Sequence, residues 1–400
     1  MPRFQIRIET LYLLTLAALN TITCYLVLEY GFYGSAVLFK SVDKPEDVWT
    51  NLAVLLAGYA CLYAFMASRR EPHARPRTHH DRLDAAYSLI IGVNWLIFLT
   101  TGIGVAGTSA QSLGFLVNML PMAPLLLVYF ADRERNVNTH YLVNLATGSL
   151  LIMLRGWSAI VVVMVIILVL SRIRVVNARN APKIVLAAGI MILAYNYLYL
   201  LKYYIREGVL FESNFLVTAE YAISRVTAFQ NFDYFSSIVP DFLGFIDGDA
   251  LFYIKEFLLA FLPKSMIGYE NYRPLDNIFA TQFIAPGIDG MEGTGFAVTL
   301  PGIFRLATEL SPLNALIFPV FALCLYGLIF VLCKPLWSPR IKYYFIITAL
   351  NLYYSGNMRE FAFCIYALVL HNLLCRLDRQ QLRSPLQTSE LTRVPHSRKA

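Results

Sequence analysis

Residues 312–333 read PLNALIFPVFALCLYGLIFVLC, a run of apolar side chains without a charged residue. A helix that crosses a membrane needs roughly 20 predominantly apolar residues, because the hydrocarbon core is about 30 Å thick and a helix rises about 1.5 Å per residue. This stretch therefore predicts a membrane-spanning helix.

The same pattern recurs along the chain and predicts about ten transmembrane helices. We place them at 9–31, 49–67, 84–106, 113–131, 139–155, 157–171, 183–204, 312–333, 342–356 and 358–375. Tight turns at Arg155-Gly156 and at 355–357 are expected to pair the short neighbouring helices as hairpins. The fold class is all-α, a polytopic integral membrane protein.

Composition supports this interpretation. Apolar residues make up 58% of the chain and charged residues 15%, whereas soluble domains carry about 25% charged residues. The net charge of +7 is judged by where the basic residues lie, and it predicts contact with membrane lipids and no nucleic-acid partner.

The basic residues predict the orientation. With the N-terminus in the cytoplasm, about two thirds of the 33 lysines and arginines fall in short inside segments, as the positive-inside rule requires. Both termini are then cytoplasmic, and the protein is a multi-pass membrane protein.

Four regions follow from these spans. Residues 1–204 hold seven spans, 205–311 form a large loop on the outer side, 312–375 hold three spans, and 376–400 form a cytoplasmic tail expected to be disordered. Within the loop, 215–239 and 250–262 predict short interfacial or re-entrant helices over the outer face.

Arginines on the outer side, where the charge rule disfavours them, are the candidate binding residues. They are Arg155, Arg225, Arg273, Arg305 and Arg359. A guanidinium grips phosphate oxygens with two parallel donors, so several arginines in one pocket suit a diphosphate. Each could instead extend to lipid headgroups or pair with a nearby carboxylate. The outer lysines, Lys44 among them, are read as surface charges.

A general base must come from the outer carboxylates, of which Asp276 and Glu309 lie near Arg273 and Arg305 in the sequence. The histidines are all predicted on the cytoplasmic side. Nucleotide-binding, hydrolase and metalloprotease motifs are absent, and the six cysteines form no CxxC pair. We therefore expect no metal and no cofactor.

The turn LRGW at 154–157, the segment TGFAVTLPGIFRLATELSPLNALIFPVFALCLYG at 294–327 and the closing GNMREF at 356–361 resemble the Wzy-type oligosaccharide repeat-unit polymerases. Many members carry a glycine–glutamate pair where this chain has Arg305-Leu306. The resemblance implies a GT-C-like glycosyltransferase in O-antigen and lipopolysaccharide biosynthesis, metal-independent and inverting.

Such an enzyme joins repeat units linked to undecaprenyl pyrophosphate at the periplasmic face of the bacterial inner membrane. The resemblance thus implies that the loop at 205–311 is periplasmic and that a chain-length regulator protein is a partner. Two alternatives stay open. An O-antigen ligase shares the architecture but is thought to use an outer-face histidine. A transporter or flippase of lipid-linked oligosaccharide is expected to distribute charges through the middles of its spans.

Overall fold

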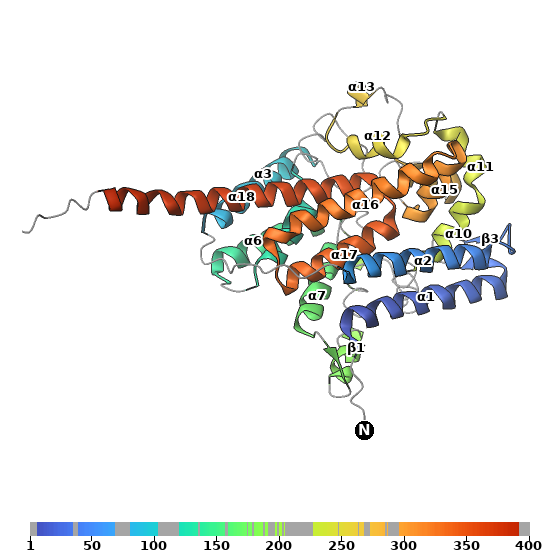
Figure 1. The fold of residues 1–400 in the computed structure, drawn as a ribbon, viewed down its shortest axis with the longest axis horizontal. Helices are drawn as coiled ribbons and strands as arrows, with labels where there is room; N and C mark the ends of the chain where they lie inside the picture. Colours follow the sequence, from blue (N-terminus) through green and yellow to red (C-terminus); the bar gives the residue numbers. More distant parts are fainter. Residues whose placement is uncertain are drawn as a thin grey trace, which may run out of the picture.

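The computed structural model describes most of the helical chain (Figure 1). The described residues are 6–34, 39–68, 81–102, 120–134, 137–156, 159–173, 175–177, 180–186, 189–190, 197, 200–201, 204, 227–246, 248–262, 264–267, 273–284, 286 and 296–391.

Helices occupy nine of the ten predicted spans. They are α1 (Ile8–Tyr30), α2 (Val48–Ala67), α3 (Asp81–Thr101), α5 (Met122–Asp132), α6 (Thr139–Leu154), α7 (Ala159–Arg172), α16 (Asn314–Cys333), α17 (Pro339–Ser355) and α18 (Met358–Leu391). The predicted span at 183–204 lies largely outside the described residues. Five helices, α1, α2, α3, α16 and α18, are long and apolar enough to cross a membrane by length and composition.

The surface of α16 shows why these helices suit a bilayer. Leu316, Val320 and Leu323 follow one another at helical spacing, and their exposed fractions are 72%, 61% and 56%. A soluble protein would bury such a stripe or cover it with a partner. The exposed apolar stripe and the length of the helices together define an all-α membrane protein.

Helix α17 forms the centre of the bundle. It packs against α2, α5, α7, α15 and α16, and most of its residues are buried. Its tyrosines need partners inside this core. Tyr353 donates to the carbonyl of Leu55 at 3.0 Å, and the Tyr344 hydroxyl lies 3.2 Å from the Cys364 sulfur. A helix surrounded in this way fixes the positions of those around it.

Short helices gather at one end of the bundle (Figure 1). They are α10 (Phe229–Ser237), α11 (Val239–Phe242), η1 (Leu243–Phe245), α12 (Phe252–Leu258), α13 (Lys264–Ile267), α14 (Leu275–Ile278), the π-helical η2 (Phe279–Ile284) and α15 (Leu300–Leu310); η3 (Lys334–Leu336) follows α16.

The packing of α10 bears on one predicted short helix. Residues 215–226 of the predicted helix at 215–239 lie outside the described residues. The remainder, α10, lies among α1, α2 and α15 with nearly all its side chains buried, and its interfacial or re-entrant placement in a membrane stays a prediction. The predicted helix at 250–262 corresponds to α12, which packs against α18.

Aromatic side chains make a core for this end of the molecule. The Phe235 ring meets those of Phe242 and Phe279 edge to face, with centroids 5.0 and 5.2 Å apart. All three are fully buried. These three rings stabilise the packing of the short helices.

Two antiparallel strand pairs were not predicted. Strand β1 (Ile6–Arg7) pairs with β4 (Val175–Val176), and β2 (Phe32–Gly34) pairs with β3 (Phe39–Ser41). The β2–β3 pair joins α1 to α2 beside α10 and holds Tyr33 in place.

Residues predicted on opposite sides of the membrane lie at opposite ends of the bundle. At one end Lys342, which was predicted inside, lies 3.2 Å from Glu9, the first residue of the first predicted span. At the other, Tyr33 and Asp233, both predicted outside, are hydrogen-bonded. Which end faces the cytoplasm stays a prediction. The tail differs from expectation: α18 continues to Leu391, so the disorder predicted from 376 is wrong for 376–391, and 392–400 lie outside the described residues.

Candidate functional site

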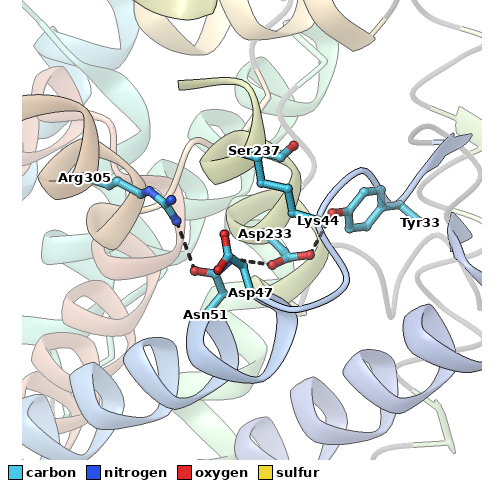
Figure 2. A pocket seen from close by; sticks show the side chains of 7 residues that line it. All are labelled: Tyr33, Lys44, Asp47, Asn51, Asp233, Ser237 and Arg305. Carbon is cyan, nitrogen blue, oxygen red and sulfur yellow. Dashed lines mark hydrogen bonds between the residues drawn. The ribbon is translucent and has the colours of Figure 1, made fainter. Parts of the chain in front are cut away.

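Arg305 enters the site from α15. The residue before this helix, Thr299, has φ +61° and accepts a hydrogen bond from the Gly302 N–H at 3.2 Å. Pro301 occupies the first turn, where a missing N–H costs little. The helix begun in this way packs on α2 and α10, and Arg305 lies on the side that faces them (Figure 2).

Asp233 lies opposite Arg305, on α10. Its exposed fraction is only 3%. The Tyr33 hydroxyl donates to Oδ2 at 2.7 Å, and the Asn51 amide nitrogen donates to Oδ1. A buried carboxylate is costly unless it accepts such hydrogen bonds, so β2 and α2 together hold an anion that α10 could not bury alone.

Asn51 joins the carboxylate to the guanidinium. Its amide oxygen accepts from Nη1 of Arg305 at 3.3 Å while its nitrogen donates to Asp233. The dipole of the amide is therefore oriented by a cation on one side and an anion on the other. Figure 2 shows the hydrogen bonds that connect these side chains in the order Arg305, Asn51, Asp233 and Tyr33.

Burial raises the pKa of Asp233, and the hydrogen bonds from Asn51 and Tyr33 and the nearby Arg305 charge offset part of that rise. Burial beside the Asp233 charge also raises the pKa of Tyr33, so this hydroxyl stays a donor. A carboxylate with a raised pKa binds a proton more readily near neutral pH, as a general base must.

The hollow around these groups is small. It is lined by Tyr33, Lys44, Asp47, Asn51, Asp233, Ser237 and Arg305, and apart from space open to solvent it encloses almost no free volume. A large substrate would therefore touch this hollow with one group and lie mostly outside it.

A second cluster brings two predicted residues together. Nη2 of Arg359 lies 3.5 Å from Oδ1 of Asp276, and the Asn357 amide donates to Oδ2 at 3.1 Å. The Arg359 and Asp276 side chains are 30% and 20% exposed, so ligand phosphates could reach the guanidinium. Arg273, exposed and just before α14, lies three residues from Asp276 in the chain.

A close backbone contact connects the two clusters. Gly356, in the turn between α17 and α18, lies so close to the backbone of Thr299 that a Cβ would overlap it. Thr299 leads into α15 and Arg305, and Gly356 precedes Asn357 and Arg359. Both clusters are thus built on one framework.

Arg155 and Glu309 belong to neither cluster. Arg155 is buried at the end of α6, where Nη1 and Nη2 donate to the side chain and carbonyl of Asn94 at 3.0 and 3.1 Å. Glu309 is exposed and makes no ion pair with Arg305. Arg225 lies outside the described residues. The five arginines are therefore not shown to meet in one pocket.

Sequence reasoning did not single out Tyr33, Asn51 or Asp233 as site residues. Lys44, which was read as a surface charge, is exposed at the hollow. One signal was available for Asp233: it is the sole charged residue in the aromatic run FQNFDYF at 229–235. An acidic side chain amid buried aromatics needs a reason to be there.

No family model matches the chain, and no similar protein was found among curated proteins or among solved structures. The class of protein therefore rests on the chain itself. It is an all-α membrane protein with a buried carboxylate and arginines at one end of its bundle.

Proposed function

We propose that the chain is a membrane glycosyltransferase that polymerises oligosaccharide repeat units linked to undecaprenyl pyrophosphate. The observation that carries this proposal is the buried Asp233 carboxylate, held by Tyr33 and Asn51, with the Arg305 guanidinium bound to the same amide. A base beside a fixed cation is what transfer from a diphosphate leaving group requires.

In the proposed reaction, Asp233 accepts the proton of the acceptor sugar's hydroxyl. The hydroxyl oxygen bonds to the anomeric carbon of the donor from the face opposite the diphosphate. The bond from that carbon to the diphosphate oxygen breaks, and its electron pair leaves with the lipid diphosphate. A guanidinium stabilises the charge that develops there, and the anomeric configuration is inverted.

Asp233 replaces the earlier candidates as the preferred base. Asp276 is paired with Arg359, so its charge is already matched, and Glu309 is exposed outside the hollow. Arg305 and Arg359, each partly exposed at this end, are the preferred diphosphate ligands. Arg273 lies near enough in the chain to assist Arg359.

The ligase alternative depends on an outer-face histidine. Of the histidines in the described ranges, His140 contacts Ser88 and His371 contacts Asp132, both at the end of the bundle opposite Asp233; the others lie outside those ranges. The flippase alternative has no comparable observation in its favour. Polymerase is therefore the preferred function, at the periplasmic face of an inner membrane, with a chain-length regulator as the expected partner.

A strain that lacks the protein tests the proposal. We expect its lipid A–core to carry at most one repeat unit, seen as the loss of the glycan ladder on a gel. Wholly uncapped core with accumulated lipid-linked polymer would instead identify a ligase. Failure to export even single units would identify a flippase, and an unchanged ladder would contradict all three.

A further inference from the structure

A second group of reactive side chains lies at the opposite end of the bundle. Asp132 is the last residue of α5, and His371 and Cys375 lie four residues apart on α18. Their exposed side-chain fractions are small: His371 is fully buried, Asp132 is 6% exposed as a side chain and Cys375 is 4% exposed. Residues four apart share one face of a helix, so α18 presents both toward α5.

The donor atoms converge. One carboxylate oxygen, one imidazole nitrogen and one sulfur lie within 4.8 Å of one another, and Nε2 of His371 is 3.1 Å from Oδ2 of Asp132. Bonds of about 2.0–2.3 Å to a tetrahedral zinc ion place its ligand atoms roughly 3.3–3.8 Å apart. Small side-chain rotations therefore suffice to reach this geometry.

The surroundings orient the histidine. Nδ1 lies 2.7 Å from the Tyr87 hydroxyl, which also lies 3.3 Å from the Leu125 carbonyl. A histidine that binds a metal through one nitrogen usually has the other fixed by such a hydrogen bond. Arg133, which follows Asp132 in the chain, is bound to Asp84.

We propose that Asp132, His371 and Cys375 bind one divalent transition-metal ion, with zinc the best match to the mixed oxygen, nitrogen and sulfur ligands. The Cys375 thiol loses its proton to solvent on binding. One carboxylate and one thiolate balance the dication, so the buried site carries no net charge. The ion fastens the end of α5 to α18 and leaves a fourth coordination position.

The sequence predicted no metal because its cysteines form no close pair. The proposed site uses one cysteine, Cys375. The other ligands are Asp132 on α5 and His371, which lies one helical turn before Cys375 on α18. Without the fold, the approach of Asp132 could not be foreseen.

The test uses the full chain, purified in detergent without a polyhistidine tag. We expect elemental analysis to find about one zinc per chain. Cys375→Ala and His371→Ala should lose it, while Cys364→Ala, which removes another buried thiol from α18, should keep it. Tyr87→Phe should weaken zinc affinity by about 10–100-fold.

A measurement on the wild-type chain avoids variants that fail to fold. Removal of zinc with a chelator should lower the Tm, and added zinc should restore it. Cobalt in place of zinc should give a sulfur-to-metal charge-transfer band that Cys375→Ala lacks. The proposal is overturned if folded, zinc-supplied protein holds no stoichiometric metal, or if Cys375→Ala holds as much; Asp132 and His371 are then an ion pair.

Discussion

Asp233 takes its hydrogen bonds from Tyr33 and Asn51, which precede it by 200 and 182 residues. Sequence patterns report neighbours within a helix or strand, so no pattern could supply these partners. By contrast, Asp276 and Arg359 were both named from the sequence, and the structure places them together. The ion pair between them could not be predicted from the sequence.

The raised pKa of Asp233 has a consequence for stability. Folding favours its protonated form, so its contribution to stability is fully present below the ordinary pKa of 3.8 and is lost as the pH rises through the raised folded pKa. The Tm of the wild type minus that of Asp233→Asn should therefore increase as the pH falls. A difference that stays constant or decreases toward acid pH would show that the carboxylate is not held in this way.

Arg305 and Arg359 test the proposed diphosphate ligands. Alanine at either position should lower the polymerisation rate by a hundredfold or more, because a lost contact to a transition-state anion costs about 3–4 kcal/mol. Lysine keeps the charge without the two-pronged donor set, so it should rescue only partly. Membrane levels of each variant serve as the control. If both lysine variants make full-length glycan at the normal rate, Arg305 and Arg359 do not bind the diphosphate through two parallel donors.

At the scale of elements, the apolar runs predicted where nine of the described helices lie, and five of these are long and apolar enough to cross a membrane. These five could be predicted because a span needs a long apolar stretch whatever its neighbours are. The place of α10 could not be predicted, since its aromatics suit a membrane interface as well as a protein core. Its burial depends on α1, α2 and α15, which are distant in the sequence.

The turn between α17 and α18 should tolerate no side chain at Gly356. Its φ of +63° and the adjacent Thr299 backbone both disfavour a Cβ. Gly356→Ala should destabilise the fold by about 2 kcal/mol or more, measured as a lower Tm in detergent. Gly327→Ala, where a Cβ would meet no atom within 4 Å, is the matched control and should be neutral or slightly stabilising. Equal Tm values for the two variants would contradict the close turn.

For the whole molecule, the basic residues predict which end of the bundle faces the cytoplasm. Reporter fusions at residues 75, 177 and 385 should be cytoplasmic, and one at 285 should be periplasmic. This follows from the short basic inside segments. A cytoplasmic reporter at 285 would place Asp233 and the arginines on the cytoplasmic side, where basic residues are usual. It would contradict a periplasmic enzyme.

The most direct test is polymerisation by the purified protein, supplied with the lipid-diphosphate-linked repeat unit isolated from the deletion strain. The wild type should produce a ladder of lengthening glycans and release lipid diphosphate. Asp233→Asn should produce none, while Asp241→Asn, which changes an exposed carboxylate on α11, should match the wild type. A ladder from Asp233→Asn at the wild-type rate, with both proteins folded, would contradict Asp233 as the base.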